Sequence, residues 1–262
     1  MKKLIASSLI AIGAFASMNA QAMTVTFGGI NPGDGSYLTS ALTPGNANNP
    51  LAGIYVDTFD RPSQLGGGCG PNSGMLGVSI TGNVRYTTGN PSGSAHPAND
   101  TTCYASGPDQ LYSGNNNPLN TVTVDFTNAL ANTFPGKHID YLGLYWGSID
   151  RYNDITFYAN GAPITISSLN GVAFNKSVLD GDDILSLFGG NPGDRSSANT
   201  NRYVNMFFGD NEQFDKFVMH SSSYAMEIDN VAIRVAIPEP SVVMLFGIAM
   251  LGLGLSSKRR KI

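Results

Sequence analysis

The sequence predicts an all-β protein, an antiparallel β-sandwich of jelly-roll type. Roughly ten short segments alternate apolar with polar residues or are rich in β-branched and aromatic residues. Between them lie turn-forming stretches, supplied by 31 glycines and 14 prolines. Helical periodicity is almost absent. Once the two terminal segments are set aside, residues 23–237 are long enough for one such domain.

The first half of this domain predicts a strand at residues 23–29 and another at 53–59. Residues 75–87 predict an interrupted strand or a hairpin that turns at Gly82 and Asn83. Residues 88–119 are dense in Gly, Pro, Asn and Ser, and we expect them to form a long exposed loop.

The second half is more regular and contains the clearest strand patterns, at residues 120–126, 139–147, 153–158, 162–166, 202–208, 214–220 and 224–235. Residues 139–147 are apolar on both faces, as in a central strand, so core packing is expected for Trp146 at its end. The broken alternation near Asp229 and Asn230 predicts a β-bulge. A short helix is allowed only within residues 178–188.

The N-terminus has the three parts of a secretory signal peptide. Lys2 and Lys3 precede an apolar run over residues 4–16, and Ala20 and Ala22 form a small-residue cleavage pattern. Signal peptidase is therefore expected to remove residues 1–22, and the mature chain is expected to begin at Met23.

The C-terminus, residues 238–262, also has three parts. Pro238, Glu239 and Pro240 precede an apolar run over residues 241–257 that contains no charged residue. As a helix this run would extend about 25 Å, enough for a thin bilayer or a tilted span. The cations Lys258, Arg259, Arg260 and Lys261 follow and would hold the end in the cytoplasm.

This order of motif, apolar helix and basic cap resembles the PEP-CTERM sorting signal of exosortase-dependent surface proteins of Gram-negative bacteria. The resemblance covers about the last 25 of the 262 residues. It implies an exosortase-type transpeptidase that recognises Pro238, Glu239 and Pro240, cuts nearby and passes the body to the cell surface or extracellular matrix. The inner membrane would then be a transient anchor.

Charge separates the body from its ends. Two of the fifteen Lys and Arg residues precede residue 23 and four follow residue 257, so nine remain in the body. Of the nineteen Asp and Glu residues only Glu239 lies outside it, which leaves eighteen. A body this acidic has no basic patch to neutralise phosphates, so nucleic acid is not an expected partner.

The body contains two cysteines, Cys69 and Cys103. An exported chain enters an oxidising compartment, so a disulfide between them is expected. It would close a loop of roughly 35 residues and stabilise the fold by roughly 3–4 kcal/mol. A redox or metal pair is the alternative, but the cysteines lack the Cys-x-x-Cys spacing.

Metal and sugar ligands are further candidates. Asp180, Asp182 and Asp183 flank a glycine and offer oxygen ligands for Ca²⁺, with Asp210, Asn211 and Glu212 as a second group. Sugar rings stack on exposed aromatic residues, for which the candidates are Tyr104, Tyr112, Trp146 and Tyr152. No cofactor is required by any motif.

Catalytic patterns are weak. His96, His138 and His220 are far apart, and no nucleophile or metalloprotease motif is present. A glycosidase would need two carboxyl groups, for which Glu227 and Glu212 are the candidates. The sequence therefore favours an exported structural or adhesive protein, associated with exopolysaccharide. A carbohydrate-active enzyme or a carbohydrate-binding module on the same scaffold is the alternative, and a surface domain that needs Ca²⁺ to fold is a third.

Overall fold

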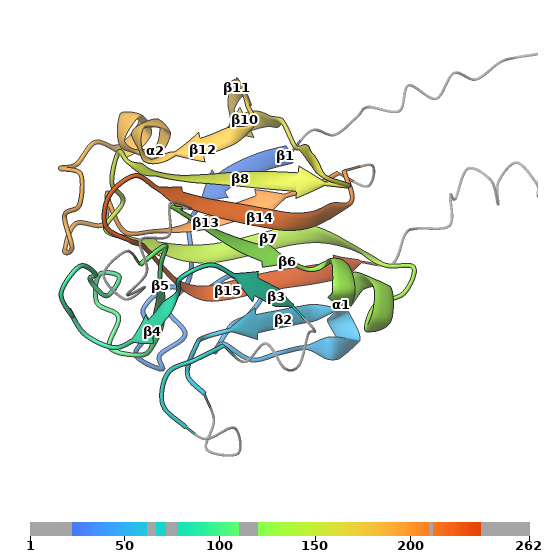
Figure 1. The fold of residues 1–262 in the computed structure, drawn as a ribbon, viewed down its shortest axis with the longest axis horizontal. Coiled ribbons are helices and arrows are strands. Elements are labelled where there is room, and N and C mark those ends of the chain that lie inside the picture. Colours follow the sequence, from blue (N-terminus) through green and yellow to red (C-terminus); the bar gives the residue numbers. More distant parts are fainter. Residues whose placement is uncertain (1–22, 62–66, 72–77, 110–119, 210–211, 237–262) are drawn as a thin grey trace, which may run out of the picture.

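A computed structural model describes residues 23–61, 67–71, 78–109, 120–209 and 212–236. The predicted signal peptide, the sorting segment after Ile237 and the candidates Tyr112, Asp210 and Asn211 lie outside these residues. The described chain is built almost entirely of β-strands (Figure 1).

The strands of the first half are shorter than the sequence predicts: β1 Met23–Phe27, β2 Ile54–Asp57, β3 Ser79–Thr81, β4 Arg85–Thr87, β5 Tyr104–Gly107 and β6 Thr121–Asp125. A 3-10 turn, η1 Pro50–Ala52, precedes β2, and a helix, α1 Thr127–Asn132, follows β6. Sequence reasoning missed α1, which has no side-chain N-cap and is only six residues long.

The second half contains β7 His138–Gly147, β8 Asn153–Ala159, β9 Ala162–Pro163, β10 Ile166–Leu169, β11 Val172–Lys176, β12 Val178–Asp180, β13 Arg202–Phe207, β14 Phe214–Ser221 and β15 Met226–Ala236. Helix α2 Gly181–Phe188 falls where a helix was allowed. The β-bulge is confirmed, because the pairing of β15 with β7 shifts register between Asp229 and Ala232.

The all-β prediction is confirmed, but the strands pair into one mixed sheet rather than two separate antiparallel sheets. Its main path runs β11-β10-β1-β13-β7-β14-β6-β3. Strand β15 pairs with β7, β2 and β5, while β8 pairs with β14, β12 and β9. The β1–β10 pair is parallel, which an all-antiparallel jelly roll does not contain.

Of the two alternatives predicted for residues 75–87, the structure shows the interrupted strand, as β3 and β4, and not the hairpin about Gly82 and Asn83. Strand β3 pairs with β6, and β4 pairs with β5, so the two strands of the supposed hairpin join different partners. The exposed loop predicted for residues 88–119 fits residues 88–93, which are exposed or partly exposed, but is wrong for most of residues 94–109. Strand β5 is buried along its whole length, and Ala95, Ala98 and Asp100 are buried before it.

One large cluster of buried apolar side chains, drawn from most of the longer strands, forms the core. Strand β7 pairs with β13, β14 and β15, and all of its residues except Asp140 are buried. Trp146 is fully buried, as predicted. Phe208 and Phe214 stack with their ring centroids 4.2 Å apart. Each buried aromatic side chain contributes about 1.5–3 kcal/mol through removal of apolar surface from water.

Register along β7 defines two ends of the domain. At the start of β7, His138 pairs with Ala236 and Ile139 pairs with Phe214; Met23 lies at the same end, because Thr24 pairs with Phe207 and Phe207 with Tyr141. We call this the terminal end. At the other end, Gly147 pairs with Glu227. This is the loop end, formed with residues 30–46, 94–103 and 191–201.

The described helices do not reach the length and apolarity needed to cross a membrane. The apolar run predicted to span the bilayer lies outside the described residues.

Candidate functional site

The loop end contains a group of buried polar side chains that interrupts the apolar pattern of β15. Glu227, Asp229 and Asn230 are each at most 3% exposed. Side chains alternate along a strand, so Glu227 and Asp229 point to the same face while Met226 and Ile228 point into the core. We call Glu227, Asp229 and Asn230 the polar segment of β15.

Glu227 fixes residues 94–103 to the sheet. One carboxyl oxygen accepts a hydrogen bond from the backbone N–H of Ala95 at 3.1 Å, and the other accepts from the Ser148 hydroxyl at 2.6 Å. Burial raises the pKa of Glu227 to about 8, although both hydrogen bonds act in the opposite direction. Near neutral pH the folded domain therefore holds this carboxyl group largely protonated.

Asn201, at the start of β13, joins two loops. Its carbonyl oxygen accepts from the backbone N–H groups of Ala98 and Ser148, both at 2.9 Å. Its amide donates to the carbonyl oxygens of Asp194 and Ser197, also at 2.9 Å. One buried side chain thus holds residues 94–103 and 191–201 together at the loop end.

Asn230 does the same for residues 30–46. Its side-chain amide donates to the Ser36 hydroxyl and to the carbonyl of Leu38, both at 2.8 Å, and its backbone carbonyl accepts from the Tyr203 hydroxyl at 2.9 Å. A positive φ of 48° at Asn230 lets the bulge direct this side chain toward the loop. Three loops are therefore each fixed by a buried polar residue.

Asp229 and Asp100 form a buried acid pair beneath the same loops. Burial raises the pKa of Asp100 to about 6 and that of Asp229 well above its usual range, and each carboxyl group shifts the pKa of the other. The backbone N–H of Asn230 opposes the effect of burial on Asp229, and the side chains of Asp229 and Asp100 act directly on each other. A proton held on Asp229 and shared with Asp100 accounts for this arrangement, since two adjacent carboxylates cannot both ionise cheaply when buried.

The glycosidase candidates are not brought together. Glu227 pairs with Gly147 at the loop end, while Glu212 lies just before Phe214, which pairs with Ile139 at the terminal end. Ile139 and Gly147 are eight residues apart on β7, which places the two ends roughly 25 Å from each other. Glycosidase carboxyl pairs are about 5–10 Å apart, so Glu227 and Glu212 do not form one.

The calcium candidates have other partners. Asp180 caps α2 by accepting from the backbone N–H of Asp183 at 2.8 Å, and Asp183 accepts in return from Asp180. Asp182 pairs with Arg151 at 2.7 Å, and Lys176 contacts both Asp180 and Asp183. In the described ranges, no three His, Cys, Asp or Glu side chains are placed to hold a metal ion. The three aspartates therefore act as a helix cap and as ion-pair partners.

The aromatic candidates also divide. Tyr104 and Trp146 are fully buried and cannot stack on a sugar, whereas Tyr152 is partly exposed and donates its hydroxyl to Asp150 at 2.7 Å. Tyr224, which sequence reasoning passed over, is 51% exposed in the β14–β15 connection at the loop end. Its place after a Ser-rich turn was the available indication.

Cys69 and Cys103 form the predicted disulfide, with Cα atoms 5.4 Å apart and 34 residues apart in sequence. The bond joins the segment after β2 to the start of β5. The backbone N–H of Cys103 also donates to Asp60 at 3.0 Å, and Asp60 forms a β-bridge with Cys69.

The histidines do not assemble into a site. His138 is buried at the start of β7, His220 contacts Asp154 on β8 at 2.8 Å, and His96 contacts the carbonyl of Pro97 at 2.8 Å. His96 and His220 thus have different partners, and His138 lies at the terminal end.

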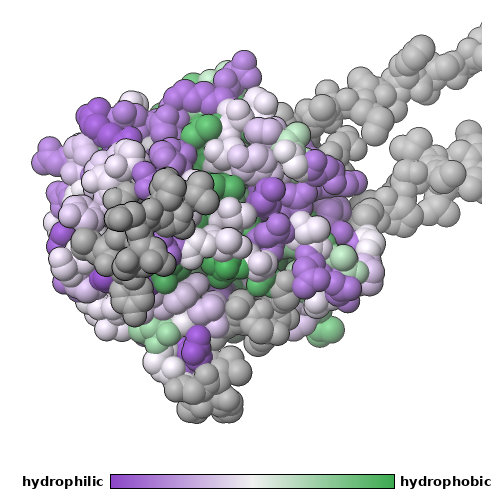
Figure 2. All heavy atoms as spheres, in the orientation of Figure 1, coloured by the Kyte–Doolittle hydropathy of each residue, from purple (hydrophilic) through white to green (hydrophobic). Residues whose placement is uncertain are grey.

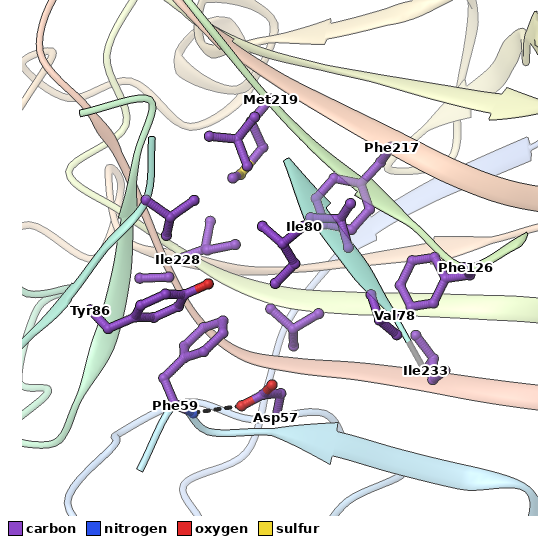
Figure 3. Close-up of a pocket in the computed structure, with 15 residues that line it drawn as sticks. Asp57, Phe59, Val78, Ile80, Tyr86, Phe126, Phe217, Met219, Ile228 and Ile233 are labelled. Carbon is purple, nitrogen blue, oxygen red and sulfur yellow. Dashed lines mark hydrogen bonds between the residues drawn. The ribbon is translucent and has the colours of Figure 1, made fainter. Parts of the chain in front are cut away.

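Two hollows remain. Apolar side chains of β3, β6, β14 and β15 surround a cavity of about 50 Å³, with Asp57 and Tyr86 at its edge (Figure 3). It is far smaller than the roughly 300–1,000 Å³ of a typical ligand site. Figure 2 shows hydrophobic side chains exposed between largely hydrophilic surroundings on this face. A second hollow of about 510 Å³ lies beside α1 at the terminal end.

Comparison with known proteins assigns the C-terminal segment. Residues 236–260 match the PEP-CTERM protein-sorting motif. The resemblance predicted from Pro238, Glu239, Pro240 and the following apolar and basic residues is thereby confirmed. No curated protein and no solved structure matches the chain.

Proposed function

We propose that this protein, which carries the sorting motif of exported, exosortase-sorted proteins, serves as a structural or adhesive component of the cell surface or extracellular matrix. The motif at residues 236–260 is the observation that carries the proposal. Exopolysaccharide is the proposed contact, because an acidic surface rich in Asn, Ser, Thr and Gly suits a neutral, hydroxyl-rich partner.

The way the chain leaves the sheet supports this proposal. Strand β15 remains paired to its last residue, Ala236 opposite His138, so only Ile237 separates the sheet from Pro238. While the tail holds the protein in the membrane, the terminal end must face the bilayer. The loop end then points away by the length of β7, roughly 30 Å.

The loop end is accordingly the proposed contact surface. Loops on a rigid scaffold commonly carry binding residues, and here three loops are fixed by Glu227, Asn201 and Asn230. Partly exposed Tyr152 and exposed Tyr224 lie at this end and could stack on sugar rings.

Replacement of Pro238, Glu239 and Pro240 by alanine tests the sorting step. We expect uncut precursor to accumulate in the inner membrane and the surface-displayed species to disappear, measured by fractionation and intact mass. Pro192→Ala, in a turn of the loop end, is the matched control and should be sorted normally. Unchanged mass and location of the alanine variant would refute sorting through this motif.

The proposed contact is tested separately on a glycan array, with Tyr224→Ala and Tyr152→Phe as variants. The same glycans are assayed for hydrolysis, because a carbohydrate-active enzyme is the alternative function. Turnover that Glu227→Gln abolishes without a loss of folding would replace the structural role by a catalytic one.

A further inference from the structure

The first residue of β1 contacts a residue from almost the other end of the domain's sequence. The backbone nitrogen of Met23 donates to Glu212 Oε1 at 2.7 Å, although the two residues are 189 positions apart. The other carboxyl oxygen of Glu212 accepts from the backbone N–H of Gly209, also at 2.7 Å. Glu212 therefore holds the start of β1 against the loop between β13 and β14.

The position of this nitrogen is fixed from several sides. Met23 is fully buried and belongs to the hydrophobic core. Its strand pairs with β13 on one side and with β10 on the other, and the Ser167 hydroxyl donates to the Met23 carbonyl at 3.2 Å. The strand register, and not a flexible side chain, thus places the nitrogen on the carboxyl group.

The backbone donors to Glu212 do not fully compensate the burial of its carboxyl group. Burial raises its pKa, and only the two backbone N–H groups, of Gly209 and Met23, lower it. A neutral amide donor compensates little of the cost of desolvating a carboxylate, whereas an adjacent cation compensates much more. A positive charge on the Met23 nitrogen, which lies 2.7 Å from Glu212 Oε1, would offset more of this cost than the amide does.

Signal peptide removal would create that cation. Hydrolysis of the bond between Ala22 and Met23 consumes one water; the new carboxylate leaves with residue 22, and the amine that stays on Met23 takes up a proton at neutral pH. The mature nitrogen has three N–H donors and a positive charge in place of one amide N–H.

We infer that Glu212 is a binding site for the chain's own α-ammonium group, formed when the signal peptide is cut off before Met23. The inference rests on the export step of the proposed function and goes beyond it. In the precursor, Glu212 accepts a hydrogen bond from the backbone amide of Met23. In the mature protein, it forms an ion pair with the α-ammonium group of Met23 at the start of β1. Processing at the N-terminus thereby stabilises the folded domain.

Four protein variants distinguish this ion pair from a simple hydrogen bond between Glu212 and a backbone amide. Residues 23–262 are prepared in mild detergent by protease cleavage of a fusion protein. In one form Met23 is the first residue, and in the other two extra residues precede it. Each form carries Glu212 or Glu212→Gln. We expect the substitution to lower the thermal midpoint by about 5 °C when Met23 is free and by about 2 °C or less when it is extended.

Asp215→Asn is the matched control. Asp215 lies at the same end, is partly buried, and accepts from the backbone N–H of Asn160. Its effect on the midpoint should be the same with and without the extension. Equal losses for Glu212→Gln in the two backgrounds would overturn the ion pair.

The α-amino pKa gives a readout that a purely structural role would not move. Titration of the ¹³C-dimethylated N-terminus by NMR should give a pKa above the ordinary value of about 8, and Glu212→Gln should lower it. Sequencing of the exported protein fixes the cut site. A first residue other than Met23 would overturn this site while leaving the C-terminal sorting proposal intact.

Discussion

The two ends of the domain are built on different principles. At the terminal end, backbone pairing of Ala236 with His138 and a single carboxyl contact from Glu212 to Met23 hold the two chain ends. At the loop end, the polar segment of β15 and Asn201 fix three loops through buried side chains. The first end relies on strand register, whereas the second relies on hydrogen bonds from buried polar side chains.

This difference has an energetic consequence. A buried polar group that loses its partner destabilises the fold by about 1–3 kcal/mol. Because Asn201 bonds to two loops, a substitution there affects both loops together. The terminal end tolerates change better where only backbone bonds are involved. Solvent conditions should likewise act mainly on the loop end, because its carboxyl groups have strongly raised pKa values.

The disulfide gives the largest expected effect and tests whether the loop end needs covalent support. Cys69→Ser with Cys103→Ser should lower the free energy of unfolding by about 3–4 kcal/mol, as expected for a loop of 34 residues. Chemical denaturation under oxidising conditions measures it. If the double variant unfolds at the same denaturant concentration, the polar contacts alone hold these loops.

Glu227→Gln sharpens the comparison through pH. The folded pKa of about 8 exceeds the usual 4.5, so the folded state keeps a proton that the unfolded state has released. The resulting stability is complete below about pH 4.5 and is lost as the pH rises to about 8. Asp100, at about 6, acts in the same direction. A single group contributes at most about 1.4 kcal/mol per pH unit.

We therefore expect the thermal midpoint of the wild type to fall from pH 5 to pH 8, and Glu227→Gln to show a flatter profile. Asp34→Asn is the control from the same end. Its pKa is lowered from 3.8, through hydrogen bonds from Ser36 and Asn46 that outweigh burial, so it stays charged across this range and its replacement should leave the slope unchanged. An equally steep slope in Glu227→Gln would assign the pH dependence elsewhere.

Gly147→Ala disrupts the contact between β7 and residues 94–103 at one position. An added Cβ would lie 2.8 Å from Pro97 Cα, so residues 94–103 must move away from β7. Overpacking of this kind costs about 1–3 kcal/mol. Hydrogen exchange should increase at Ala95 and Ala98, whose N–H groups are bonded to Glu227 and Asn201, and stay unchanged at the terminal end. Faster exchange at both ends would mean that the two are coupled.

The smallest effect concerns Asp180. Removal of this N-cap by Asp180→Ala should cost about 1 kcal/mol. Because the three candidate carboxylates are engaged in capping and ion pairs, EDTA should leave the thermal midpoint of the wild type unchanged. A midpoint that drops in EDTA and recovers with Ca²⁺ would restore a calcium site.

Strand positions could be predicted from the sequence where a single strand's own pattern determines them. Apolar residues on both faces placed β7 in the centre, and broken alternation located the bulge at Asp229 and Asn230. Pairing partners could not be predicted this way. The sequence around Gly82 allows an interrupted strand or a hairpin, and it does not show that β3 pairs with β6 while β4 pairs with β5.

The loop end was the hardest part to predict. Residues 94–103 have the composition of an exposed loop, but Glu227 and Asn201 supply hydrogen bonds that allow their backbone to be buried. Composition cannot show that such partners exist elsewhere in the chain. The charged and amide residues within β15 were the available indication, because a carboxyl group in a buried strand requires a partner.

The short exit from β15 also determines how the domain bears load. Antiparallel neighbours flank this strand, β7 on one side and β2 with β5 on the other. A force applied through the residues after Ala236 acts along the strand axis, so the hydrogen bonds to both neighbours are sheared together rather than opened one at a time. A protein held by this end would resist flow or traction through a strand that is paired on both sides.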